Sequence, residues 1–186
     1  AHFSATTIQR VMDSIYKDRI THMIAVPTML SLIHRLGIEF AENFKSSDFK
    51  FIVSCAGHLE TELWTNFEST FSVKICNLYG LTETVTSVLI SGAAAPSRCV
   101  GTLGLPVNST IRIVDFSGDD VSDGIEGELL ISGPQIMDGY YKNPQATESI
   151  LKEGWLFSGD LVKRNSDGHV ELVGRLKNLI ISGGRN

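Results

Sequence analysis

Residues 73–83 read VKICNLYGLTE, a strand-like apolar run that ends at a glycine. Open α/β sheets bind their ligands where a strand ends and the chain turns. Gly80 can take a positive φ and lets a ligand approach the backbone closely. Tyr79 offers a flat face to a base, Thr82 can donate to a phosphate oxygen, and Glu83 is a hard oxygen ligand suited to Mg²⁺. The alternative is a tight turn with a core tyrosine and a solvated glutamate, and this stretch alone leaves both interpretations open.

The sequence before about residue 92 alternates between helical and strand-like patterns. Apolar residues recur at helical spacing in 7–20 and 59–71, whereas 51–54 is a short β-branched run. Strands that alternate with helices indicate a layered α/β fold with a mostly parallel sheet. The expected helices cover 7–20, 28–36 and 59–71, and the expected strands cover 21–26 (a buried strand), 51–54 and 73–79.

The character of the sequence changes after Gly92. Four of the 17 glycines lie at or before Gly92, and the other thirteen lie from Gly101 onward. Turn residues separate short β-rich runs here, which is typical of a small β-barrel or a tightly curled sheet. The expected strands cover 110–116, 127–132, 159–163, 169–173 and 179–182, with a short helix over 143–151. We therefore expect an α/β subdomain over 1–98, a β-barrel-like subdomain over 99–174, and a hinge with the start of a further domain over 175–186.

The composition of the chain indicates which kinds of partner and which cellular compartment to expect. The net charge is −5 and no basic run is present, which argues against a nucleic-acid surface. Three widely spaced cysteines, Cys55, Cys76 and Cys99, indicate reduced core residues of an intracellular protein rather than a disulfide framework or a zinc site. No apolar run approaches the length of a membrane span. We therefore expect a cytoplasmic protein.

Two later motifs add charged groups that suit a nucleotide. Asp160 directly follows a glycine in WLFSGD (155–160), at the expected start of a strand, where a carboxylate can accept both ribose hydroxyls. Arg175 lies in GRLKN (174–178) and is a permanently charged fork for ribose and phosphate oxygens. The alternatives are an ordinary turn aspartate and a surface arginine in a rim salt bridge.

Five motifs, taken in order and approximate spacing, resemble those of the AMP-forming, adenylate-forming enzymes. That superfamily includes acyl-CoA synthetases, coumarate–CoA ligases, luciferases and the adenylation domains of peptide synthetases. The chain departs from the family pattern at His58, where proline is common, and at Ser158, where threonine is usual. The resemblance implies part of the large domain of such an enzyme. The motifs cover residues 54–59, 77–83, 127–147, 155–160 and 174–186.

The resemblance also implies roles for individual residues. The motif over 127–147, with its Gly139-Tyr140-Tyr141 run, receives only a structural role. The catalytic pair is Thr82, at the α-phosphate, and Glu83, on Mg²⁺. The remaining roles are adenine contacts for Gly57 and Tyr79, further nucleotide contacts for Asn77 and Gly80, ribose contacts for Asp160 and Arg175, a hinge for Lys177, and a coenzyme A tunnel at Gly183 and Gly184.

The function implied is that of an ATP-dependent, AMP-forming carboxylate–CoA ligase acting on a small-molecule carboxylic acid, such as a fatty or aryl acid. Its cofactors are ATP, Mg²⁺ and coenzyme A. Two alternatives remain: an adenylation domain that loads a carrier protein, and a non-catalytic β-rich binding module. The run over 177–184 is closer to CoA ligases. Both ends look cut, and the family's phosphate loop and C-terminal lysine are outside the 186 residues, so we expect the fragment alone to be inactive.

Overall fold

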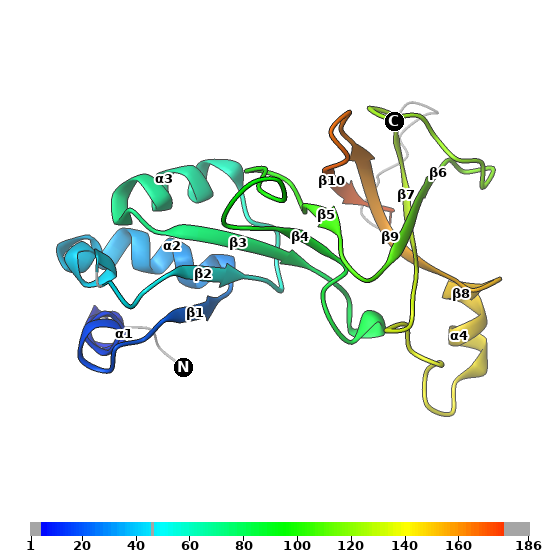
Figure 1. Ribbon diagram of the computed structural model, residues 1–186. Coiled ribbons are helices and arrows are strands. Elements are labelled where there is room, and N and C mark those ends of the chain that lie inside the picture. The colour runs from blue at the N-terminus through cyan, green and yellow to red at the C-terminus, as the bar shows by residue number, and fades with distance from the viewer. Residues whose placement is uncertain (1–4, 46, 177–186) are drawn as a thin grey trace, which may run out of the picture. The chain divides into compact units, whose positions relative to one another are not determined.

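The computed structural model describes residues 5–45 and 47–176 (Figure 1). The chain divides into two units. Ala1–Leu78 and Ser91–Gly101 belong to the first unit, and Tyr79–Ile90 and Thr102–Asn186 belong to the second. The chain therefore passes from one unit to the other three times, after residues 78, 90 and 101.

Three strands form the parallel part of the first unit. They are β1 (His22–Ala25), β2 (Phe51–Ser54) and β3 (Lys74–Tyr79), whose last residue belongs to the second unit. β2 pairs in parallel with β1 and with β3. Figure 1 shows the three strands side by side. The predicted parallel sheet in a layered α/β arrangement is confirmed.

Only one face of these strands is buried. Ile52 lies opposite Met23 and Ile75 in the two ladders, and both isoleucines are fully buried. Ile24 is 66% exposed. Successive side chains of a strand point to opposite faces. The prediction that 21–26 is a buried strand is therefore wrong, because the described helices cover one face and alternate residues point to the other.

Helices and a 3-10 segment supply the rest of the first core. The predicted helices are confirmed within a few residues, whereas the 3-10 segment was not predicted. Aromatic side chains of the third helix, Trp64, Phe67 and Phe71, are fully buried. They share one face because three- and four-residue spacings follow the helical repeat. The elements are α1 (Ala5–Lys17), α2 (Pro27–Leu36), η1 (Ile38–Lys45) and α3 (Thr61–Phe71).

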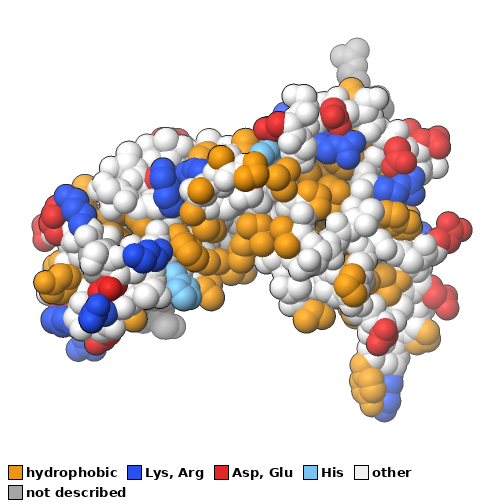
Figure 2. All heavy atoms as spheres, in the orientation of Figure 1, with side chains coloured by type: hydrophobic (Ala, Val, Ile, Leu, Met, Phe, Trp, Pro, Cys, Tyr) orange, Lys and Arg blue, Asp and Glu red, His pale blue; other side chains and the backbone are white. Residues whose placement is uncertain are grey.

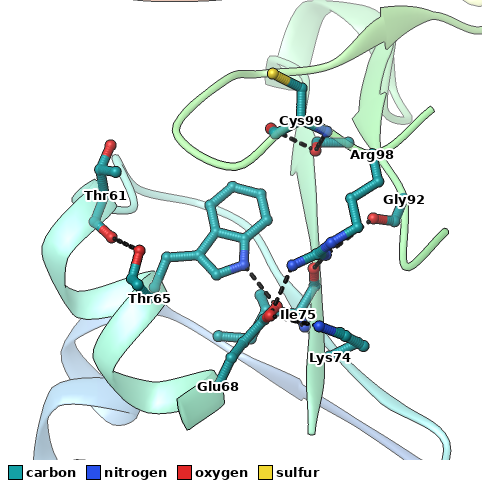
Figure 3. Close-up of polar contacts among 10 residues, drawn as sticks. Thr61, Thr65, Glu68, Lys74, Ile75, Gly92, Arg98 and Cys99 are labelled. Atoms are coloured by element: carbon teal, nitrogen blue, oxygen red, sulfur yellow. Dashed lines mark hydrogen bonds and ion pairs between the residues drawn. The ribbon is translucent and has the colours of Figure 1, made fainter. Parts of the chain in front are cut away.

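The carboxylate of Glu68, which is partly buried, links α3 to β3 (Figure 3). Glu68 Oε1 accepts hydrogen bonds from Trp64 Nε1 and from the Ile75 N–H, both at 2.8 Å. Its Oε2 accepts from Arg98 Nη2 at 2.6 Å and from Lys74 Nζ at 3.2 Å. Burial acts to raise the pKa of Glu68, but these hydrogen bonds outweigh it and the pKa is lowered.

Arg98 extends this network to the chain that returns after residue 91. Its Nη1 donates to the carbonyl oxygens of Ile75 and Gly92, each at 3.3 Å. Its guanidinium lies 5.8 Å from the centre of the Trp64 ring. One side chain therefore ties the returning segment to both a strand and a helix of the first unit.

The second unit is built on an antiparallel sheet. The strand order is β10-β9-β7-β6, and a short strand, β8 (Leu151–Lys152), also pairs with β9. Among the described residues the sheet is open at β6 and β10, so it is a curled sheet rather than a closed barrel. The predicted strand over 179–182 lies outside the described residues. The four main strands are β6 (Thr110–Val114), β7 (Glu126–Ser132), β9 (Trp155–Arg164) and β10 (Val170–Arg175).

Shorter elements complete the second unit. β4 (Leu89–Ser91), whose last residue belongs to the first unit, pairs antiparallel with β5 (Leu105–Pro106), and η2 (Thr82–Thr84) follows β3. The predicted short helix is confirmed as α4 (Pro144–Ile150). Asn143 caps it, since its Oδ1 accepts a hydrogen bond from the Ala146 N–H at 3.2 Å. The buried core of this unit includes Val88, Leu89, Leu129, Ile131, Leu156, Val162 and Val170.

The distribution of charge, the burial of the cysteines and the length of the helices can be compared with the expectations from the sequence. On the face shown in Figure 2, basic side chains are interspersed with acidic ones. Cys55, Cys76 and Cys99 are only half-buried, so the prediction that they are core residues is wrong. None of the helices that the structure describes is both long and apolar enough to cross a membrane.

Candidate functional site

Asp160 brings together residues from three separate motifs. It is 1% exposed and lies in the middle of β9. The Tyr79 hydroxyl donates to its Oδ2 at 2.6 Å, and Arg175 Nε lies 2.8 Å from its Oδ1. Arg175 faces Asp160 directly in the ladder between β10 and β9. The expected place of Asp160 at the start of a strand is wrong, because β9 already begins at Trp155.

This cluster is asymmetric in exposure. The side chain of Arg175 is 59% exposed, whereas that of Asp160 is 2% exposed. A buried carboxylate is costly unless it is paired, and here both oxygens have a partner. Asp160 Oδ1 forms an ion pair with Arg175, but the geometry of this contact is not that of a hydrogen bond. Burial, and then the charge of Asp160, raises the pKa of Tyr79, so the phenol stays protonated as a donor.

Gly80 lies exposed at the end of β3, where the sequence predicts a glycine turn. It does not take a positive φ, so the expectation that the turn uses this freedom of glycine is wrong, whereas the close approach of a ligand stays a prediction. A Cβ at Gly80 would lie 2.6 Å from the Thr86 carbonyl oxygen and 3.0 Å from Ser87 Cα. The position requires glycine because the chain folds back against it.

Thr84 holds this turn in place and was not singled out from the sequence. It is fully buried, and its hydroxyl accepts a hydrogen bond from the Leu81 N–H at 2.9 Å. The same oxygen lies 2.8 Å from the Thr86 carbonyl oxygen, to which it can donate. Two threonines follow Gly80 within four residues, and no local signal distinguishes the buried one from the exposed Thr82.

Val85 is the strained residue of the turn. Its backbone has φ 59° and ψ −40°, and its side chain is 80% exposed. The Thr86 N–H lies 2.5 Å from the Thr84 carbonyl oxygen, which closes a γ-turn around Val85. Positive φ is unfavourable for a β-branched residue, so the turn is held by its surroundings rather than by its own preference.

Thr82 and Glu83 lie together in η2. Thr82 is exposed and Glu83 is half-exposed. The Tyr140 hydroxyl donates a short hydrogen bond to Glu83 Oε1, and the Met137 N–H donates to the Glu83 carbonyl oxygen at 2.9 Å. The hydrogen bond to Glu83, and then burial, raises the pKa of Tyr140. A half-exposed carboxylate with one oxygen fixed by a neutral donor suits Mg²⁺, which takes one or two carboxylates beside phosphates and waters.

Gly57 and Asn77 lie in the first unit. Gly57 is exposed in the loop that follows β2, and the positive φ of that loop falls on Ala56, at 60°. Asn77 is 5% exposed within β3. Lys177, Gly183 and Gly184 lie outside the described residues.

Comparison with known proteins identifies similar sequences. The family model described as "AMP-binding enzyme" matches residues 1–141. A feruloyl-CoA synthase from Amycolatopsis sp is 32% identical over 180 residues, which cover 95% of this chain and 35% of that relative. A long-chain-fatty-acid–CoA ligase from Yersinia pestis is 44% identical over 110 residues, which cover 58% of this chain and 19% of that relative. The chain thus spans about a third of the length of the first of these relatives and less of the second.

Solved structures share the fold. The anthranilate CoA ligase AuaEII in complex with anthranoyl-AMP superposes with a TM-score of 0.85 at 23% identity, covering 98% of this chain and 35% of that one. The O-succinylbenzoate coenzyme A synthetase MenE from Bacillus subtilis, in complex with ATP and magnesium ion, gives a TM-score of 0.80 at 25% identity. That match covers 100% of this chain and 37% of MenE. The α/β fold with a β-rich second part is therefore shared with part of each of these proteins.

Proposed function

The chain belongs to the AMP-binding enzyme family, and from that premise we propose that it is part of an ATP-dependent, AMP-forming carboxylate–CoA ligase. In the first step, an oxygen of the substrate carboxylate bonds to the α-phosphorus of ATP. The bond to the bridging oxygen breaks, and acyl-AMP and pyrophosphate result. In the second step, the sulfur of coenzyme A bonds to the acyl carbon, AMP leaves and the thiol proton is lost. Such phosphoryl chemistry depends on positioning and on neutralising charge.

The observation that best supports this proposal is the contact of Asp160 with both Tyr79 and Arg175. They come from three motifs, and they pair a buried carboxylate with a guanidinium that reaches solvent. In our proposal Asp160 and Arg175 contact the ribose. Tyr79 contributes an adenine contact through its ring.

Asp160 cannot accept ribose hydroxyls in the arrangement described, because its carboxylate is covered. The Tyr79 hydroxyl occupies one oxygen and Arg175 occupies the other. Arg175 is the partner that can move, since its side chain is 59% exposed. We therefore propose that Arg175 leaves Oδ1 when nucleotide binds, and then contacts the nucleotide itself.

Glu83 and Thr82 are proposed as the catalytic pair. Glu83, whose Oε1 accepts from Tyr140, would hold Mg²⁺ with its carboxylate, and the metal would supply neutralisation of phosphate charge. Thr82 is exposed at the start of η2 and donates its hydroxyl proton to an α-phosphate oxygen. Both roles fit the chemistry of the side chains.

The remaining assignments complete the proposal. Gly57, Asn77 and Gly80 contact the nucleotide, Lys177 is a hinge, and Gly183 and Gly184 form a coenzyme A tunnel. The α/β subdomain over 1–98, the β-rich subdomain over 99–174 and the hinge segment over 175–186 belong to the same proposal. We also propose a cytoplasmic location, because Cys55, Cys76 and Cys99 form no disulfide with one another. We also propose that the 186-residue chain alone is inactive, because it spans only part of such relatives.

The decisive experiment is carboxylate-dependent exchange of labelled pyrophosphate into ATP by the full-length protein. We would use ferulate, anthranilate and palmitate as probes, because relatives and solved structures are named for acids of these kinds. Glu83→Gln should abolish exchange, whereas Glu62→Gln, an exposed glutamate of α3, should leave it unchanged. Absence of exchange with every probe would contradict the adenylating function.

A second assay tests whether the acyl group is transferred to coenzyme A or to a carrier protein. Coenzyme A added after adenylation should release AMP and form a thioester. If AMP is released only with a carrier protein that bears a phosphopantetheine arm, the coenzyme A assignment is wrong and the adenylation-domain alternative stands.

A further inference from the structure

Glu83 is held at two points by one segment of the second unit. The Met137 N–H donates to its carbonyl oxygen at 2.9 Å, and the Tyr140 hydroxyl donates to its Oε1. Tyr140 is 57 residues away in sequence. The segment that contains Tyr140 therefore fixes both the backbone and the carboxylate of Glu83.

The segment is itself anchored to α4. The Tyr140 N–H donates to Thr147 Oγ1 at 2.9 Å, and the Thr147 hydroxyl donates to the Asn143 carbonyl oxygen at 3.1 Å. Gly139 has φ 153°, and a Cβ there would lie 2.9 Å from Thr147. The backbone of Tyr140 is therefore tied to the first turn of α4 through Thr147, and Gly139 packs closely against the same threonine.

The hydrogen bond of Tyr140 has a direct consequence for Glu83. A phenol has one proton to donate, and it occupies one carboxylate oxygen without adding charge. The other oxygen is left for a hard cation. A carboxylate that is already oriented loses less side-chain entropy when it ligates a metal, and such outer-shell partners tune affinity.

We propose that Tyr140 is a positioning residue that orients the Glu83 carboxylate for a divalent cation. This inference rests on the proposed function, because that function places Mg²⁺ at Glu83. It gives the motif over 127–147 a role at the nucleotide, through the Gly139-Tyr140-Tyr141 run and the start of α4.

The test compares two identical changes at adjacent residues in the full-length protein. Tyr140→Phe removes the hydroxyl that Glu83 accepts from, and Tyr141→Phe removes the hydroxyl of a side chain that is 87% exposed. Two readouts are used: the Mg²⁺ concentration that gives half-maximal pyrophosphate exchange, and the binding of Mn²⁺ in the presence of ATP, measured by electron paramagnetic resonance.

We expect Tyr140→Phe to raise both the half-maximal Mg²⁺ concentration and the Mn²⁺ dissociation constant about threefold to tenfold, with Tyr141→Phe unchanged. Saturating Mg²⁺ should restore most of the exchange rate. Thr147→Val, which removes the anchor of the Tyr140 backbone, should shift both curves in the same direction.

Two outcomes would overturn the inference in distinguishable ways. If exchange and Mn²⁺ binding occur but the Tyr140→Phe curves overlay those of Tyr141→Phe, Tyr140 does not position Glu83. The same conclusion follows if Tyr140→Phe lowers the melting temperature and the exchange rate at every Mg²⁺ concentration, since that is the signature of a structural tether. If the unsubstituted protein shows no exchange and binds no Mn²⁺ with ATP, the proposed function itself fails, and this inference fails with it.

Discussion

Arg175 faces Asp160 across the ladder between β10 and β9, with its Nε 2.8 Å from the buried Oδ1. The arginine is largely exposed and the aspartate is not. This pair is therefore a buried charge whose partner can exchange with solvent or with a ligand. The first prediction concerns that exchange.

Asp160→Asn should raise the KM for ATP about tenfold in the full-length protein, because hydrogen bonds to a charged group are worth about 1.5–3 kcal/mol. In the proposed role the carboxylate would bind ribose in both the ground state and the transition state, so KM should change more than kcat. The control is Asp123→Asn, which neutralises an exposed aspartate paired with Arg164. An unchanged KM for ATP would favour a purely structural ion pair.

Gly80→Ala should destabilise the second unit by about 1–3 kcal/mol, because overpacking a close backbone contact forces local shifts. The added Cβ would lie 2.6 Å from the Thr86 carbonyl oxygen. Gly174→Ala is the matched control, since a Cβ there meets no atom of the described residues within 4 Å and the residue has no positive φ. Melting temperatures of the two variants should differ. Equal melting temperatures for the two variants would show that the turn accommodates a Cβ at residue 80 without loss of stability.

Val85→Gly should stabilise the protein by about 1 kcal/mol, because relief of a strained positive φ, worth about 1–3 kcal/mol, outweighs the unfolded-state entropy that glycine adds. The change removes only an exposed side chain. Val100→Gly, at a position without positive φ, should give no gain in melting temperature. A loss of stability in Val85→Gly would mean that the γ-turn is not strained.

Glu68 makes stability depend on pH in a definite direction. Its pKa is lowered in the folded protein, so it contributes stability above its unfolded pKa of about 4.3 and loses that contribution as pH falls through the folded pKa. Glu68→Gln should therefore lower the melting temperature at pH 7, and the difference from the unsubstituted protein should shrink below about pH 4.3. Glu62→Gln, on the exposed side of the same helix, should show little difference at either pH. A constant difference across this range would assign the effect to packing.

The alternation of helices and strands was predictable because each element carries its own period and ends near a glycine, a proline or a polar turn. The same logic found the aspartate and the arginine of the candidate site, but not their pairing. That pairing depends on the ladder register, which a bulge between Leu172 and Gly174 shifts. The bond from Tyr140 to Glu83 joins residues 57 apart and has no local signal. The sequence predicted a glycine turn at Gly80, but it did not show that the backbone of Thr86 and Ser87 folds back so closely that a Cβ would collide with it.

The three passages of the chain between the two units have a practical consequence for dissecting the protein. Neither unit is continuous in sequence, because Tyr79–Ile90 interrupts the first and Ser91–Gly101 interrupts the second. A truncation at any single peptide bond therefore leaves at least one unit without part of its own chain. Limited proteolysis within residues 79–101 should yield nicked molecules whose pieces stay associated, and separation of the units by protein engineering requires joining segments that are distant in sequence.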